Sequence, residues 1–323
     1  MNGVGKSRIG MIDVARGVAL LAMAVYHFTW DLEFFGYIEP GTTAVGGWKL
    51  FARTIASSFL FLVGVSLVLA HGRGTRWRPF LSRLAMVAAA AAAISLVTWF
   101  AVPGGFIFFG ILHQIALASL IGLAFLRLPW LLTMLAAVLV IAAPHYLRAS
   151  FFDSPWLWWV GLSSVDPPSN DYVPVFPWTG AVLAGIAVAR LTEGLGLLAA
   201  LGLVTPGRTA APLVFIGRHS LAFYLVHQPV LIGAIWLFAQ VFPPQVTPAR
   251  ASFVDACIAT CEESRDGDFC PRYCGCVLDR LQGENRLDEV FAGSQDAETV
   301  ARLNEIAGIC TFETDTMTPA PDE

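Results

Sequence analysis

The chain has 323 residues, of which 56% are hydrophobic and only 14% are charged, with a mean hydropathy of +0.65 and a formal net charge of −4. This composition excludes an ordinary soluble enzyme. It predicts an all-α fold, specifically a polytopic helical membrane bundle.

Charge is divided unevenly along the chain. Residues 1–249 hold 14 Lys and Arg against 8 Asp and Glu, whereas residues 250–323 hold 6 against 16 and contain all six cysteines. A Pro-rich segment separates the two parts. We therefore expect the following organisation: a membrane domain over residues 1–245, a small acidic six-Cys helical domain over 250–311, and a disordered tail over 312–323.

The first apolar segment carries an acid and a base at each end. Asp13 and Arg16 lie one helical turn apart, and so do His27 and Asp31. His27 lies eleven positions after Arg16, close to three turns, so all four side chains share one stripe of the helix. Ionisable groups in a membrane helix cost about 2.5–3.5 kcal/mol each and normally face a protein interior or a wet cavity. The stripe is therefore a candidate site.

Simpler interpretations of this stripe stay open. Asp13 and Arg16 would also suit a pair at the start of the helix, with Arg16 reaching to the membrane interface. His27 and Asp31 would also suit a structural hydrogen bond inside a bundle. In the functional interpretation, the acid orients the imidazole for proton transfer.

Further apolar runs predict about seven spans in all. After the first span they cover residues 51–70, 84–102, 106–126, 130–143, 173–189 and 221–241. The stretch 195–203 is too short and too rich in glycine to span a bilayer alone. An eighth span hidden in 195–213 would move the C-terminal tail to the opposite side of the membrane.

Basic residues predict the orientation of these spans. They concentrate at the N-terminus, between Arg73 and Arg83, at Arg127, and between Arg190 and Arg208, and such segments are typically cytoplasmic. Seven spans then leave the N-terminus in the cytoplasm and the tail outside. The cysteines agree with this orientation, because disulfides persist in oxidising compartments.

The cysteine spacing predicts two helices joined by disulfides. Cys257 and Cys261 are four residues apart, as are Cys270 and Cys274, so each pair shares one helix face. Two such helices packed antiparallel favour one of the 15 pairings that six cysteines allow. That pairing is Cys257–Cys274, Cys261–Cys270 and Cys276–Cys310. Zinc binding is the alternative, although the spacing differs from the usual CxxC pattern.

Other polar residues at membrane depth are few. His113 lies in the fourth run, and Arg218 and His227 lie at the start of the last one. His113 would also suit packing, and His227 would also suit repair of the hydrogen bonds that Pro229 frees. The sequence contains no nucleotide-binding Gly-rich loop, no serine elbow and no metal-ligand cluster, so we expect no metal cofactor and no nucleic-acid partner.

Several motifs occur in an order typical of one family. They are RIGMIDVARGVALLAMAVYHFTWDLEFFG, FLFLVGVSL, GILHQIAL, DYVPVFPW and GRHSLAFYLVHQPVLI. Over about residues 8–240 the chain resembles the bacterial heparan-α-glucosaminide N-acetyltransferase-like (YeiB-related) membrane proteins. Their transmembrane acyltransferase superfamily includes the enzyme that acetylates glucosamine on heparan sulfate in lysosomes. It also includes acyltransferases that modify O-antigen sugars, whose first helix carries an Arg and a His separated by ten residues, as Arg16 and His27 are.

The resemblance implies acyl transfer across a bacterial inner (plasma) membrane, from cytoplasmic acetyl-CoA to a sugar amine or hydroxyl of a cell-envelope glycan. His27, held by Asp31, would act as general base, and Arg16, paired with Asp13, would stabilise the acyl carbonyl or bind the pantetheine arm. The remaining residues assigned in this way are His113 in the same cavity, Arg76, Arg78, Arg83 and Arg218 for coenzyme A phosphates, and Asp171, Trp178 and His227 for the acceptor. The arginines would equally suit simple positive-inside orientation.

One departure favours direct transfer. In the lysosomal relative, the histidine proposed to carry acetyl lies in the loop after the first helix, and residues 32–49 contain no histidine. A proton-coupled transporter or flippase is the competing class, because intramembrane ion pairs also suit proton relays. A membrane-anchored scaffold that binds through its Cys-rich tail is a third, and homo-oligomerisation stays open.

Overall fold

The computed structural model describes residues 9–39, 41–72, 74–244, 249–262, 265, 268–284, 286–287, 290 and 297–316. These residues form α-helices and short 3-10 helices, with no strand among them, which confirms the predicted all-α class. Two compact units are present. One comprises Met1–Thr29 with Ala44–Ala234, and the other comprises Trp30–Thr43 with Ile235–Glu323.

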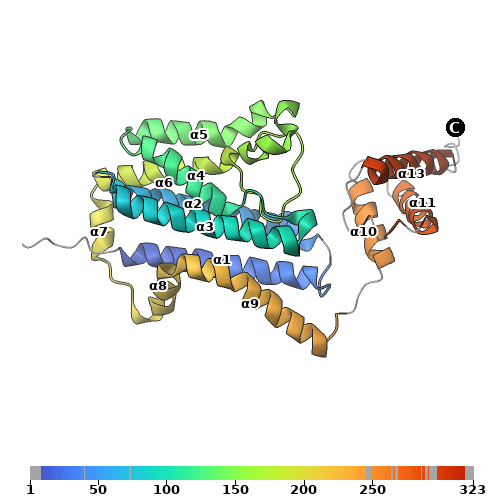
Figure 1. Cartoon of the computed structure of the whole chain (residues 1–323), viewed down its shortest axis with the longest axis horizontal. Coiled ribbons are helices and arrows are strands. Elements are labelled where there is room, and N and C mark those ends of the chain that lie inside the picture. The colour runs from blue at the N-terminus through green and yellow to red at the C-terminus, as the bar shows by residue number, and fades with distance from the viewer. Residues whose placement is uncertain are drawn as a thin grey trace, which may run out of the picture. The chain divides into compact units, whose positions relative to one another are not determined.

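The first unit is a bundle of long apolar helices (Figure 1). Its helices are α1 (Gly10–Phe34), α2 (Gly46–His71), α3 (Trp77–Ala101), α4 (Ile111–Phe125), α5 (Trp130–Leu147), α6 (Val175–Gly194), α7 (Leu197–Leu203), α8 (Ala211–Arg218) and α9 (Ser220–Val241). The ends of α1 and α9 extend into the second unit. Within the bundle α6 packs against α2, α4 and α5, and α3 packs against α4. Figure 1 shows α1 and α9 along one edge and α5 along the opposite edge.

Six of the described helices are long and apolar enough to cross a membrane, which makes this a multi-pass membrane protein. They are α1, α2, α3, α5, α6 and α9. A seventh span results if α7 and the segment Arg208–Arg218, bent by 99° to each other, are counted together. The weakly apolar stretch after α6 therefore forms two short helices with a sharp bend between them, because Gly and Pro residues interrupt it.

The predicted fourth span is shorter than expected. α4 has only 15 residues, about 22 Å at 1.5 Å per residue, which is less than the hydrocarbon thickness of a bilayer. The chain turns through a 3-10 helix at Pro103–Gly105, and residues 106–110 are not helical. Gly110 lies against Asp171, whose carboxylate would clash with a Cβ at this position. This close approach sets the start of α4 at Ile111.

Glycines allow the helix backbones to touch. A Cβ on Gly64 of α2 would clash with the carbonyl of Val182 in α6, and a Cβ on Gly185 would clash with the carbonyl of Phe61. Small residues are the usual means of close packing between membrane helices, where no hydrophobic force drives association. Buried Leu60, together with Leu183 and Ile186 of α6, forms part of the core around this contact.

The second unit contains the described helices α10 (Ala249–Cys261), α11 (Phe269–Gly283) and α13 (Ala297–Thr316). Buried Val277, Leu281 and Ile306 form its core. The disulfides are Cys257–Cys274, Cys261–Cys270 and Cys276–Cys310, which confirms the predicted pairing. Since all six sulfur atoms are used, none of the cysteines offers a thiolate to zinc.

Order extends further along the tail than the sequence indicated. α13 continues through residues 312–316, and Thr314 within them is buried. The disorder predicted from residue 312 is therefore wrong for these five residues, which continue the helix carrying Cys310. Residues 317–323 and 245–248 lie outside the described residues, so the expected tail and most of the Pro-rich linker stay predictions.

Candidate functional site

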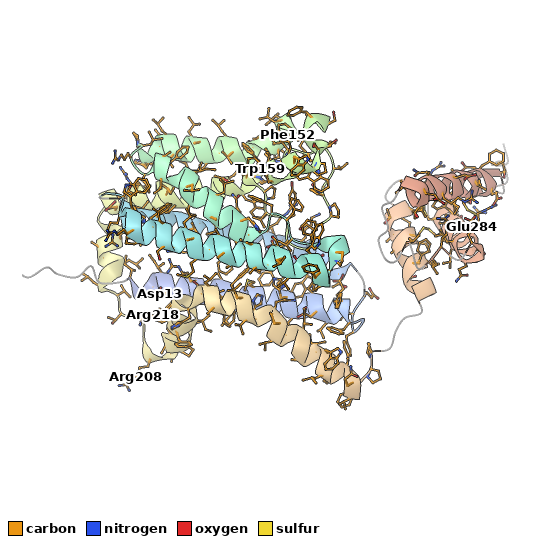
Figure 2. The ribbon with its side chains drawn as sticks, in the orientation of Figure 1. Asp13, Phe152, Trp159, Arg208, Arg218 and Glu284 are labelled. Atoms are coloured by element: carbon orange, nitrogen blue, oxygen red, sulfur yellow. A yellow bond between two sulfur atoms is a disulfide. The ribbon has the colours of Figure 1, made fainter. Side chains whose placement is uncertain are left out.

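A buried carboxylate joins α1 to α8 near the N-terminal end of α1. The Asp13 side chain is 1% exposed and accepts a hydrogen bond from Arg16 Nη1 at 3.2 Å. Arg218 Nε lies 3.6 Å from its other oxygen, and Figure 2 shows Asp13 and Arg218 side by side. Gly217 contacts the Asp13 backbone so closely that a Cβ would clash there. Two guanidinium groups therefore share one buried acid, and the predicted Asp13–Arg16 pair is present.

Arg16 also faces a cavity of about 270 Å³ between α1, α2, α3, α4 and the α8–α9 segment. Its Nη2 donates a hydrogen bond to Ser66 Oγ at 2.5 Å. Arg83, Arg218 and His219 line the same cavity, and Leu20, Phe59, Leu112 and Tyr224 are among its other lining residues. A cavity with three arginines and an apolar wall suits an anionic ligand that has a less polar arm.

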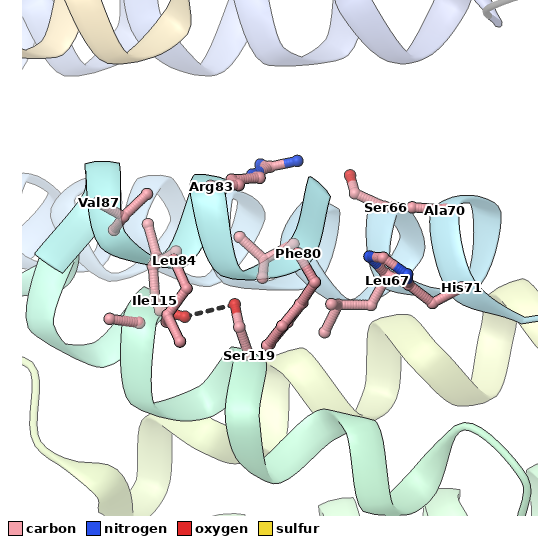
Figure 3. A pocket seen from close by; sticks show the side chains of 12 residues that line it. Ser66, Leu67, Ala70, His71, Phe80, Arg83, Leu84, Val87, Ile115 and Ser119 are labelled. Carbon is pink, nitrogen blue, oxygen red and sulfur yellow. Dashed lines mark hydrogen bonds between the residues drawn. The ribbon is translucent and has the colours of Figure 1, made fainter. Parts of the chain in front are cut away.

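A smaller cavity of about 40 Å³ adjoins the first between α2, α3 and α4. Ser66 and Arg83 line both cavities. In Figure 3 the polar ends of these two side chains point to one side, away from Phe80 and Ser119. Arg83 therefore lies where the two cavities meet, and its positive charge can act on a ligand in either cavity.

Two histidines lie together further along α1 and α9. The ring centroids of His27 and His227 are 5.0 Å apart, with the ring planes at 80°. The side chain of Gln228 hydrogen-bonds His27. His227 Nδ1 lies 2.7 Å from the Tyr224 carbonyl oxygen, which can only accept, so Nδ1 carries a hydrogen.

This tautomer leaves His227 Nε2 as an acceptor in the neutral ring. The side chain is 9% exposed, and Nε2 is buried without a hydrogen-bond partner among the described residues. An open, buried ring nitrogen is a suitable acceptor for a hydrogen of a substrate amine or hydroxyl.

Asp31, predicted to hold His27, is fully buried one turn further along α1. The His27 ring hydrogen-bonds Gln228, which was not among the predicted site residues. The His27–Asp31 interaction stays a prediction.

Asp171 and Tyr224 form a second polar pair inside the bundle. Asp171 Oδ2 accepts a hydrogen bond from the Ile111 amide at 2.9 Å, and its side chain also shares a hydrogen bond with Tyr224. Burial raises the pKa of the Asp171 carboxyl, although the Ile111 amide and the Tyr224 hydroxyl oppose this shift. Both carboxylate partners belong to the chain itself, whereas the resemblance suggested a contact with the acceptor sugar.

The other predicted site residues lie apart from the large cavity. His113 Nδ1 accepts from the Gly110 amide at 3.2 Å, and its Nε2 lies 3.2 Å from Ser95 Oγ, so both ring nitrogens have partners in the chain. Trp178 is half-buried in the main apolar cluster. Arg76 and Arg78 are exposed and line neither cavity, unlike Arg83 and Arg218.

Tyr224, a polar residue of the last apolar run, had no predicted role in the site. It lines the large cavity, bonds Asp171 through its side chain and bonds His227 through its carbonyl. Tyr224 lies three residues before His227, so both side chains are on one face of the helix. This spacing is the feature of the sequence that could have indicated Tyr224 as a site residue.

Comparison with known proteins gives one match. The family model described as heparan-alpha-glucosaminide N-acetyltransferase, catalytic, matches residues 8–229. Neither the curated proteins nor the solved structures give a match. The matched region includes every residue that lines the large cavity, as well as His27 and His227.

Proposed function

Because the chain belongs to the heparan-alpha-glucosaminide N-acetyltransferase catalytic family, we propose that it is an integral-membrane acyltransferase that moves acetyl from acetyl-CoA to a sugar amine or hydroxyl. One observation carries the proposal. The arginine-lined cavity and the His27–His227 pair meet at Tyr224, so a site for an anionic donor adjoins a site that can take up a proton.

The charge of the large cavity supports acetyl-CoA as the donor. Coenzyme A carries a diphosphate and a 3′-phosphate, which arginine binds through charge-assisted, often bidentate hydrogen bonds. Arg83 and Arg218 would bind these phosphates, while Arg16, fixed by Asp13 and Ser66, would contact the pantetheine arm or the acyl carbonyl. Exposed Arg76, just before α3, and exposed Arg78, in its first turn, would add attraction.

The histidine pair supports direct transfer. His27 would remove the proton from the acceptor as its nitrogen or oxygen attacks the thioester carbonyl carbon. The new C–N or C–O bond then replaces the C–S bond, and coenzyme A leaves as a thiolate that takes up a proton. Gln228 would orient the His27 ring, and His227 Nε2 would accept a hydrogen bond from the acceptor. Buried Asp31 would stabilise the imidazolium that forms.

The proposed orientation counts the broken pair of α7 with Arg208–Arg218 as a seventh span. The donor cavity lies near the N-terminal end of α1, which we assign to the cytoplasm, and the acceptor would reach the histidines from the opposite side. We assign the protein to a bacterial inner membrane. The three disulfides support a location of the second unit in the oxidising periplasm.

Labelled acetyl transfer by the reconstituted full chain tests the proposal. We expect radioactive acetyl-CoA and glucosamine to give acetylated glucosamine, with loss of about 10²–10⁴-fold in rate for His27→Ala. His145→Ala, on the exposed end of α5, is the matched control and should keep the rate. An inactive wild-type protein would refute the proposal. Uptake of labelled sugar into vesicles without acetyl-CoA would favour a transporter instead.

A further inference from the structure

Tyr224 connects the large cavity, the segment before α6 and the next turn of its own helix, α9. It lines the arginine-containing cavity, shares a hydrogen bond with Asp171, and accepts a hydrogen bond from His227 at its carbonyl. Its ring packs against three separate apolar clusters, one of which contains Leu20 and another Leu112. The Tyr224 ring is therefore held by packing against several parts of the bundle.

Asp171 is held equally firmly. It precedes α6 and reaches the first turn of α4, where Oδ2 accepts the Ile111 amide hydrogen at 2.9 Å. Gly110 makes this approach possible, since any Cβ there would clash with Oδ2. Asp171 thus connects Tyr224 to the start of α4, and neither residue has a chemical role in the scheme above.

We propose that the Tyr224 hydroxyl is a catalytic hydrogen-bond donor to the thioester carbonyl oxygen of the donor, and that Asp171 in its neutral form is the positioning residue that donates to the Tyr224 oxygen. The inference rests on the proposed acyl transfer. Neither residue makes or breaks a covalent bond. Both act by stabilising the negative charge that develops on the carbonyl oxygen as the acceptor attacks.

The direction of the hydrogen bond decides which way the phenol hydrogen points. An ionised Asp171 would accept that hydrogen and keep it from the donor. A neutral Asp171 instead donates to the Tyr224 oxygen, which leaves the phenol hydrogen for the cavity. Burial raises the pKa of Asp171 and so favours the neutral form, as in other apolar sites where a protonated acid donates a hydrogen bond.

Removal of the hydroxyl is the first test. Thiol release from acetyl-CoA, with glucosamine as the acceptor, should show a kcat about 10²-fold lower for Tyr224→Phe, while the KM for acetyl-CoA changes little. Tyr172→Phe is the matched control, because Tyr172 also has a partly buried hydroxyl, which donates to the Trp158 carbonyl at 2.6 Å outside the cavity. A wild-type kcat in Tyr224→Phe, or a rise in KM alone, would overturn the inference.

The second test separates a neutral from an ionised Asp171. In Asp171→Asn the amide oxygen can still accept from Ile111 and the amide nitrogen can donate to Tyr224, so kcat should stay within about tenfold of the wild type. Asp171→Ala should lose as much as Tyr224→Phe, and the double variant should lose no more. An equal loss in Asp171→Asn and Asp171→Ala would show that the charge is needed, which contradicts the proposal.

These results differ from a failure of the proposed function. A wild-type chain that releases no thiol and forms no acetylated sugar refutes acyl transfer and the inference with it. A chain that is active, loses activity in His27→Ala and keeps it in Tyr224→Phe refutes the inference alone.

Discussion

His227 lies with its ring centroid 5.0 Å from that of His27, and its Nδ1 donates to the Tyr224 carbonyl one turn earlier in α9. This relationship fixes one ring nitrogen of His227 on its own helix and leaves the other, Nε2, buried beside His27. Two imidazoles in contact are poorly suited to carrying a positive charge at the same time. We therefore expect one proton at most to be taken up by the pair during transfer.

Replacing His227 by Asn tests its assigned role. The Asn amide can keep the hydrogen bond to the Tyr224 carbonyl, but it lacks the open Nε2. We expect the KM for the acceptor to rise about tenfold, the value of one hydrogen bond, while the KM for acetyl-CoA stays unchanged. Steady-state kinetics with either substrate varied would measure this. A loss confined to the acetyl-CoA KM would place His227 on the donor side and contradict the assignment.

Removing the Asp13 carboxylate should destabilise the membrane unit. The side chain is 1% exposed, and its negative charge balances the positive charges of Arg16 and Arg218. Asp13→Ala therefore removes the carboxylate that both guanidinium groups pair with. We expect a loss of about 3 kcal/mol, measured by thermal unfolding in detergent. Arg218→Gln is the comparison. Since Arg218 is half-exposed, its removal should cost about 1 kcal/mol or less, and equal costs would argue against the buried pair.

The contact between α2 and α6 should tolerate no added side chain. Gly64→Ala would force a Cβ against the Val182 carbonyl and push the two backbones apart. We expect a lower midpoint of thermal unfolding and a reduced yield of folded protein. Gly233→Ala in α9 is the matched control, because open space surrounds that position. It should be neutral or stabilising by up to about 1 kcal/mol, because Ala favours the helix.

The aromatic segment after α5 should loosen at acidic pH. Asp153 accepts hydrogen bonds from Ser163 Oγ and from the amide and hydroxyl of Ser164, and these bonds lower its pKa. Because the folded pKa lies below the unfolded value of 3.8, their contribution is complete above that value. It is lost as the pH falls through the lowered pKa.

Proteolysis of the connection between α5 and α6 would report this loosening. Cleavage should increase as the pH falls below the ordinary range of aspartate, and Asp153→Asn should show the increased cleavage already at neutral pH. A wild-type cleavage pattern in Asp153→Asn at neutral pH would show that the carboxylate does not hold the segment.

Local periodicity accounts for what could be predicted. The Asp13–Arg16 pair follows from a spacing of one turn, and the first two disulfides follow from pairs of cysteines spaced four apart. Local spacing did not predict which of the arginines would line the cavities. Arg83 reaches the cavities and Arg78 does not, because the rotation of α3 about its axis is set by packing against α4, which its own sequence does not contain.

The amino-acid sequence alone determined the all-α membrane class, the stripe of ionisable residues on the first helix and the first two disulfides, because each depends on spacing within one helix or between two adjacent ones. The third disulfide, Cys276–Cys310, joins the two cysteines that remained. Only the tertiary structure decided that Arg218 joins Asp13, that Gln228 contacts His27 and that Asp171 bonds Tyr224. Each of these pairs joins residues far apart in the chain. Two of them lie where a glycine allows a close approach, Gly217 at Asp13 and Gly110 at Asp171, and no local sequence pattern encodes this packing.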